Sequence, residues 1–270
     1  MRLSLLRDFE QAGWESTSVV AKYHEYISSV TTQSVEALLD AAGIRSGSRV
    51  LDVATGAGYI AGAAAQRGAD AIGIDFSAVQ VQMARDRYPS VRFEEGDAEA
   101  LPFDPQSFDA VVNGFGMCHF PSPDIALREA FRVLKAGGRI AFTVWDKRAV
   151  GFGAVYAAIR AHGSLEVGLP AGPNFFLLSD PEQSTKALLT AGFVSPSCRQ
   201  VPQVWRVSDP DEVFQSLVEG TVRAAATIRA QSPPARDAIR AAIRNAVAGY
   251  RRGDSHEVPM PATLATAVKP

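Results

Sequence analysis

The stretch Val50-Leu-Asp-Val-Ala-Thr-Gly-Ala-Gly-Tyr59 decides the fold, because it predicts a buried strand that runs into a glycine turn. Gly56 and Gly58 lack a Cβ atom, so the backbone can turn sharply there and approach a ligand closely. A second apolar run ends in Gly73-Ile-Asp75-Phe-Ser77, which places a carboxylate at the tip of the next strand. A carboxylate there can accept hydrogen bonds from a ribose, so the two stretches indicate a nucleoside-binding site.

Two nucleoside ligands fit this pattern. Residues 56–61 also match the dinucleotide fingerprint G-x-G-x-x-G/A, so the glycine spacing does not separate a dinucleotide from S-adenosylmethionine (SAM). Asp52 favours SAM, because the ammonium and sulfonium groups of SAM gain from a nearby carboxylate, whereas a pyrophosphate does not. The alternative interpretation of Asp52 is a carboxylate that only caps the next helix.

Five motifs follow one another along the chain. They are Asp52-Val-Ala-Thr-Gly56-Ala-Gly58, Gly73-Ile-Asp75-Phe-Ser77, Gly96-Asp-Ala-Glu-Ala-Leu-Pro-Phe103, Phe108-Asp-Ala-Val-Val-Asn113 and Leu134-Lys-Ala-Gly-Gly-Arg139. In order and spacing they resemble the class I SAM-dependent methyltransferases, with the ubiquinone and menaquinone biosynthesis type as the nearest branch. The resemblance covers about residues 35–145. This chain departs from many relatives at Ala54-Thr55, where they have Gly-Cys, and at Gln80, where they have a methionine that would pack on the adenine.

The resemblance implies that the five motifs and an amino-terminal helix hold SAM. The cofactor-binding residues expected on this basis are Tyr23, Asp52, Ala54, Thr55, Gly56, Gly58, Asp75, Phe76, Ser77, Asp97, Ala98, Asn113 and Gly114. Asp52 and the glycine turn would hold the methionine part, Asp75 the ribose hydroxyls, and Asp97 with Ala98 the adenine edge. Asn113 and the backbone of Gly114 would face the amino-acid end.

Apolar runs rich in β-branched residues alternate with helical stripes along most of the chain, which predicts βαβ units. We therefore expect an α/β fold, a Rossmann-like seven-stranded and mostly parallel sheet with helices on both faces and helical lid insertions. The expected strands cover residues 49–53, 71–75, 91–93, 108–112, 139–145, 194–201 and 262–268. The motifs fall at carboxyl ends of strands, where ligands bind in open α/β sheets.

The same pattern predicts the domain organisation. Residues 1–34 form a helical lid, residues 35–146 the SAM-binding core, and residues 147–270 the remaining strands with insertions at about 147–178 and 209–250. The second insertion is expected to be two long helices broken at Ser232-Pro-Pro234. In the lid, Trp14, Val19, Tyr23, Tyr26 and Val30 share one face of a Ser/Thr-capped helix, which is either plain core packing or a cover over the SAM site.

Methyl transfer from SAM needs alignment of acceptor and methyl group more than a nucleophile from the protein. A base helps where the acceptor is a phenol or an acidic carbon, and His119 is the candidate, because its ordinary pKa near 6.5 suits proton removal at neutral pH. The alternative is that His119 only orders the loop after its strand. Cys118 is expected to form a pocket wall, because no base stands beside it in the sequence.

Composition limits the substrate and the location. The 270 residues are 47% hydrophobic with a formal net charge of -2, which fits one globular enzyme acting on a small, largely apolar molecule and disfavours nucleic acid as a partner. Cys118 and Cys198 are expected to be reduced thiols, and no metal-ligand spacing occurs. Charges within the first eight residues disfavour a signal peptide, so a cytoplasmic protein is expected. Two other functions stay open: an NAD-dependent oxidoreductase, and a SAM-binding cyclase or binding protein that transfers no methyl group.

Overall fold

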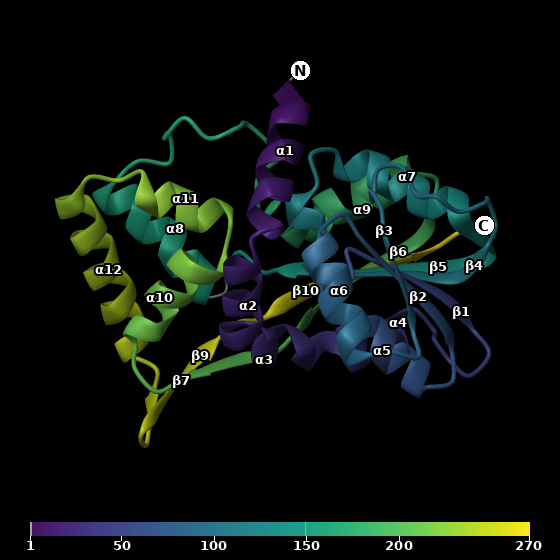
Figure 1. The fold of residues 1–270 in the computed structure, drawn as a ribbon, viewed down its shortest axis with the longest axis horizontal. Helices are drawn as coiled ribbons and strands as arrows, with labels where there is room; N and C mark the ends of the chain where they lie inside the picture. The colour runs from purple at the N-terminus through teal and green to yellow at the C-terminus, as the bar shows by residue number, and fades with distance from the viewer. Residues whose placement is uncertain (1, 149) are drawn as a thin grey trace.

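The computed structural model describes residues 2–148 and 150–270; residues 1 and 149, inside the expected lid and first insertion, lie outside the described residues. A seven-stranded sheet forms the centre of the molecule, in the order β3-β2-β1-β4-β5-β10-β6 (Figure 1). Its strands are β1 Arg49–Val53, β2 Asp70–Asp75, β3 Arg92–Glu95, β4 Phe108–Gly114, β5 Leu134–Trp145, β6 Val194–Val201 and β10 Ala262–Val268. The expected fold class is confirmed.

The strand order reverses between β1 and β4. From β1 the chain continues outward to β2 and β3 on one side, and β4 and β5 follow on the other. Open α/β sheets bind ligands at such a switch point, at the carboxyl ends of the strands. Only β10 runs antiparallel to its neighbours β5 and β6 among these strands, which keeps the sheet mostly parallel.

Helices cover both faces of the sheet. On one face lie α4 Val35–Ala41, α5 Tyr59–Gln66 and α6 Ala78–Arg87; on the other lie α7 Pro123–Val133 and α9 Pro181–Thr190 (Figure 1). Each face has its own apolar core, one including Leu38, Leu39 and Ala61, the other including Leu127 and Leu188. This burial on both faces explains why β1 and β4 read as continuous apolar runs.

A helical lobe stands beside the sheet, and it differs from the expectation. It contains α8 Val150–His162, α10 Asp211–Gly220, α11 Arg223–Arg229 and α12 Pro233–Ala248, so the first of the two helices expected over 209–250 is in fact two. The chain becomes extended at Thr221. The preceding residue, Gly220, has no room for a side chain, because a Cβ atom there would lie 2.8 Å from the Tyr23 nitrogen.

The amino-terminal segment is also more divided than the single expected helix. It forms α1 Arg2–Trp14, α2 Thr17–Tyr26, α3 Ser28–Thr31 and a short 3₁₀ turn, Thr32–Ser34. Ser16 begins α2, since its hydroxyl accepts a hydrogen bond from the Val19 amide. Trp14 therefore ends one helix while Tyr23 belongs to the next.

Smaller differences lie at strand ends. β3 begins at Arg92 instead of residue 91, and β5 begins at Leu134, where the sequence predicted the end of a helix, because Leu134 pairs with Phe108 before a register shift. A second, three-stranded sheet was not predicted; it joins β7 Val204–Val207 to β9 Ser255–Pro259 and β8 Arg251–Arg252.

Candidate active site

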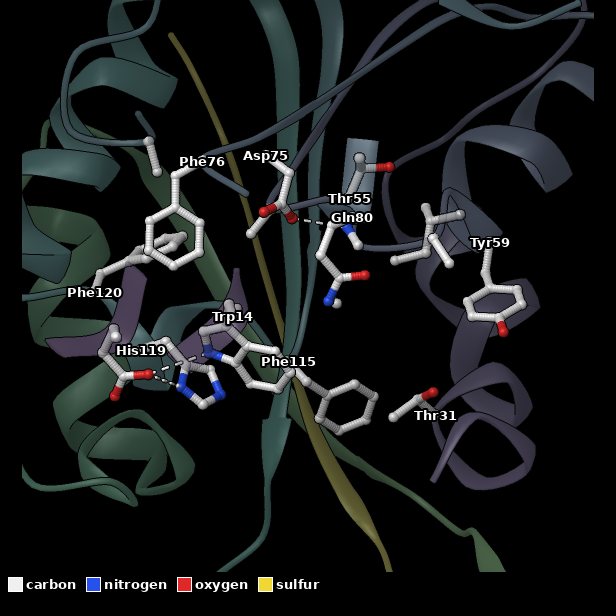
Figure 2. Close-up of a pocket in the computed structure, with 18 of the residues that line it drawn as sticks. Trp14, Thr31, Thr55, Tyr59, Asp75, Phe76, Gln80, Phe115, His119 and Phe120 are labelled. Carbon is white, nitrogen blue, oxygen red and sulfur yellow. Dashed lines mark hydrogen bonds and ion pairs between the residues drawn. The ribbon is translucent and has the colours of Figure 1, made fainter. Parts of the chain in front are cut away.

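A cavity opens at the carboxyl ends of β1, β2 and β4, under α1 and α2. Its empty space, open mouth included, is about 1140 Å³, within the order of size of small-molecule sites. Figure 2 shows Trp14 and His119 on one side of it and Tyr59 and Thr31 on the other. The expected site residues that line this cavity are Tyr23, Ala54, Thr55, Gly56, Asp75, Phe76, Asp97, Ala98, Gly114 and His119.

The glycine turn after β1 forms the floor of the cavity. Gly56 has φ +54°, and a Cβ atom there would meet only the Gln80 Oε1 atom, at 3.7 Å, so this position faces open space. Gly58, with φ +80°, begins α5 and does not line the cavity, because its Cα packs against Phe93. Gly56 thus fits close approach of a ligand, whereas Gly58 fits close packing of helix on sheet.

Asp52 corrects the main expectation from the sequence. Its side chain is fully buried beneath the turn and does not line the cavity. One carboxylate oxygen accepts hydrogen bonds from the Thr55 hydroxyl (2.6 Å) and the Ala61 amide (3.1 Å), and the other has no partner. Burial raises the pKa of Asp52 to about 7. Asp52 therefore supports the turn and the start of α5 and does not face a ligand directly, which is close to the capping alternative.

Asp75 lies where the sequence predicted it. Its two oxygens accept hydrogen bonds from the amides of Gly56 (2.9 Å) and Ser77 (3.0 Å), and its side chain lines the cavity (Figure 2). Burial raises its pKa to about 6, although the two amides oppose that shift. Ser77 is buried behind it and caps α6 by accepting from the Gln80 amide (3.1 Å). Ser77 therefore caps the helix and does not contact a ligand in the cavity, so the expectation from the sequence is wrong for this residue.

Asn113 is also placed behind the cavity. Its amide nitrogen donates to the Val53 carbonyl (2.7 Å), and its oxygen accepts from the Gly116 and Met117 amides (both 3.1 Å). All of its side chain is engaged in joining β1 to the loop after β4, so it does not line the cavity. Its neighbour Gly114 does, as expected.

Asp97 and Ala98 form the edge of the cavity beyond β3. Asp97 pairs with Arg7 of α1 (3.0 Å), and Arg7 also donates to Glu99 (2.8 Å). The amino-terminal helix is thus tied across the cavity. Gln80, which stands in place of a methionine, lines the cavity here, and its Oε1 atom lies 2.9 Å from the His24 Nε2 atom.

His119 does not have the charge state expected of a resting general base. Burial disfavours its imidazolium, but Cys118 and the Glu10 carboxylate outweigh this and raise its pKa to about 10. The Nδ1 atom lies 3.1 Å from Glu10 Oε2, so the ring is fixed by a contact with α1. The geometry favours the alternative of an ordering role over the predicted base. Cys118 is buried and lies outside the main cavity, against a smaller one.

Sequence reasoning missed several residues that line the cavity. They are Arg7, Glu10, His24, Glu99, Phe115 and Phe120. Gln80, which the sequence placed near the adenine but which was not included among the expected site residues because it departs from methionine, lines the cavity as well. Arg7, Glu10 and His24 belong to helices that carry no motif, and only the packing of α1 and α2 over the sheet brings them here.

Comparison with known proteins finds similar sequences and similar folds. Residues 51–142 match the family model described as Methyltransferase domain. A demethylmenaquinone methyltransferase of Renibacterium salmoninarum is 43% identical over 103 residues, which are 38% of this chain and 44% of that protein. An uncharacterized protein of Mycobacterium tuberculosis is 36% identical over 138 residues, 49% of this chain and 50% of its own. The chain thus matches about half the length, or less, of these curated relatives.

Solved structures share the fold over nearly the whole chain. A phosphoethanolamine N-methyltransferase of Haemonchus contortus, in complex with S-adenosyl-L-methionine, matches with a TM-score of 0.61 and 21% identity over 98% of this chain and 60% of its own. The cyclase SpnF matches with a TM-score of 0.51 and 25% identity over 88% of this chain and 81% of its own. Residues 51–142 are therefore similar to a methyltransferase domain, and the chain as a whole shares the fold of these solved structures. None of the helices in residues 2–148 and 150–270 is long and apolar enough to cross a membrane.

Proposed function

We propose that this protein is a SAM-dependent methyltransferase that transfers a methyl group to O, N or C of a small, largely apolar molecule. One observation carries the proposal: a single cavity joins the glycine turn and Asp75 to the aromatic residues of the lid, including Trp14 and Tyr23. The methyltransferase family model and the demethylmenaquinone methyltransferase relatives support it. Cytoplasmic location and a small-molecule acceptor stay predictions from the sequence.

The cavity residues fit SAM in their chemistry. The backbone at Gly56 faces open space and would accommodate the methionine part, and Gly114, which lines the cavity, would face its amino-acid end. Asp75 keeps unused lone pairs that would accept from the ribose hydroxyls, and Asp97 with Ala98 would border the adenine. SAM supplies a methyl group already activated by its sulfonium, so the residues of this chain need only align the acceptor and exclude water.

Asp75 offers the most direct test. Asp75→Ala removes one or two charge-assisted hydrogen bonds to the ribose, each worth about 1.5–3 kcal/mol, so calorimetry is expected to show S-adenosylhomocysteine binding at least about tenfold weaker. Asp75→Asn, which keeps the size and one acceptor oxygen, should lose less. Asp70→Ala, at the exposed start of the same strand, is the control and should bind like the wild type. Unchanged affinity in Asp75→Ala, or binding of NADH instead, would contradict the proposal.

A second function is favoured by one comparison, the likeness to the cyclase SpnF. A protein of that kind would bind SAM and transfer no methyl group. Incubation with SAM labelled in its methyl group and a panel of small aromatic acceptors distinguishes the two. Labelled product supports the methyltransferase, whereas retained cofactor with no product from any acceptor supports the non-transferring alternative.

A further inference from the structure

A buried cluster of charged side chains forms the wall of the cavity on the lid side. At its centre is Glu10 of α1, whose side chain is completely buried. The Glu10 carboxylate lies 3.1 Å from His119 Nδ1, accepts a hydrogen bond from Trp14 Nε1 (3.2 Å), and pairs with the Arg223 guanidinium of α11. Three elements far apart in the sequence therefore meet at one carboxylate.

The cluster places one carboxylate, Glu10, between two basic side chains, His119 and Arg223. Burial alone would raise the pKa of Glu10, but His119 and Arg223 hold it below its ordinary value, so Glu10 is ionised. Burial lowers the pKa of His119, but Cys118 and the Glu10 carboxylate, which lies 3.1 Å from Nδ1, raise it and favour the imidazolium form. Other titratable groups also face this cluster: Cys118 interacts with His119, Tyr156 lies near Glu10 and Arg223, Tyr23 lies near Cys118, and Asp75 stands across the cavity. One carboxylate thus faces two cations, and one terminal nitrogen of Arg223 is buried without a hydrogen-bond partner.

Only one polar atom of the His119 ring is left for a ligand. Glu10 engages Nδ1. In Figure 2 the other nitrogen of the His119 ring lies on the side away from the dashed line that marks this contact. His119 lines the cavity, whereas Arg223 lies behind Glu10 and does not. Aromatic rings pack against His119. Its ring centroid lies 5.3 Å from that of Trp14 and 6.0 Å from that of Phe175, both edge to face.

We propose that the His119 imidazolium, held in place by Glu10, anchors the methyl acceptor through an ionised oxygen, so that the acceptor is an aromatic phenol or an enol bound as its anion. This inference rests on the proposed function, because it concerns the acceptor side of the same cavity. On binding, the acceptor's hydroxyl proton passes to solvent and His119 keeps its own. His119 then acts as an electrostatic anchor, and Glu10 is a positioning residue that acts through its contact with the His119 ring.

A matched pair of probes tests the anchor on protein loaded with S-adenosylhomocysteine. The probes are 4-nitrophenol, whose anion absorbs visible light, and its neutral methyl ether, 4-nitroanisole. In the wild type we expect tighter binding of 4-nitrophenol, with the anion's absorbance present at a pH where the free phenol is mostly protonated. His119→Gln should weaken binding of 4-nitrophenol about ten- to hundredfold, the effect of losing a charge-assisted hydrogen bond, and leave 4-nitroanisole unchanged.

His162→Gln is the control, since His162 is exposed at the end of α8, and it should bind both probes like the wild type. Three results would overturn the proposal: equal affinity for the two probes, a bound phenol that stays neutral, or failure of both probes to bind. If the protein does not bind S-adenosylhomocysteine at all, so that it cannot be loaded, the proposed function would instead be contradicted. The two conclusions are therefore separable.

The role of Glu10 has its own readout, which a merely structural residue would not change. Nuclear magnetic resonance of the histidine rings should show His119 protonated well above pH 7 in the wild type. In Glu10→Gln the ring should titrate close to the ordinary value of about 6.5. The same titration in both proteins would contradict the positioning role. If Glu10→Gln does not fold, the probe measurements on His119→Gln decide the proposal alone.

Discussion

The two sides of the cavity are assembled over very different distances along the chain. On the sheet side, Asp75 accepts from Ser77, two residues away, and from Gly56, 19 residues away. On the lid side, Glu10 meets His119 across 109 residues and Arg223 across 213. Local turns and neighbouring parallel strands therefore fix the first arrangement, whereas the second exists only when α1, α11 and the loop after β4 have packed together.

This difference implies that the two sides respond differently to substitution. The sheet side depends on backbone conformation and close packing, so it is sensitive to added volume. The lid side depends on a buried network of charges, so it is sensitive to the loss of a partner. We expect four effects to distinguish the two sides, and they decrease in size from the glycine turn to the edge of α1.

Gly58→Ala should be the most damaging of these changes. A Cβ atom there would lie 2.7 Å from the Phe93 ring and 3.1 Å from Ala84, at φ +80°. The left-handed conformation and the overpacking together should cost about 4 kcal/mol in the free energy of unfolding, measured in urea. Gly137→Ala, at φ +77° with no atom within 4 Å, isolates the conformational part and should cost only about 1 kcal/mol. Equal losses would show that packing at the turn is unimportant.

Glu10→Gln tests the lid side, again by the free energy of unfolding measured in urea. Removal of the buried charge leaves Arg223 and His119 without their shared carboxylate, which should cost about 3 kcal/mol in the free energy of unfolding. Glu257→Gln, in the exposed pair with Arg206, is the matched control and should cost less than about 1 kcal/mol. If both variants unfold at the same urea concentration as the wild type, the buried network does not stabilise the lid.

The pH dependence of S-adenosylhomocysteine binding should report Asp75. The pKa of Asp75 in the free protein is raised to about 6, and the ribose hydroxyls bind the ionised form better. The affinity for S-adenosylhomocysteine, measured by calorimetry, should therefore be highest and constant above pH 7, where Asp75 is ionised. It should fall about tenfold by pH 5, where most of Asp75 is protonated. Asp75→Asn should flatten this profile. A wild-type affinity that is constant from pH 7 to 5 would remove Asp75 from the ribose site.

Arg7→Ala should have the smallest effect. Arg7 ties α1 to Asp97 and Glu99, but 42% of its side chain is exposed, so water and salt weaken the pair. We expect a loss of at most about 1 kcal/mol at low ionic strength, and almost none in 1 M salt. Arg128→Ala, in an exposed pair with Asp124 on α7, is the control. A loss as large as that of Glu10→Gln would mean that α1 is held mainly at its edge.

The sequence determined the sheet, because each of its signals is local. Apolar strands, the glycine turn and the carboxylate of Asp75 act over a few residues, and the seven strands were predicted to within two residues of their observed bounds, except that β5 begins five residues earlier than expected. Four expected contacts lie behind the cavity instead: Asp52, Gly58, Ser77 and Asn113. A motif shows that a residue stands at a strand end, but it does not show whether the side chain points at the ligand or beneath the turn.

Only the tertiary structure decided the lid and the state of His119. Nothing near Glu10 in the sequence marks it as a partner of His119 or Arg223, because the packing of α1 creates that proximity. The pKa of His119 follows from the same packing, since burial alone would lower it. Hydrogen bonds within a turn are fixed by the chain itself, whereas charges brought together from 213 residues apart depend on the complete fold.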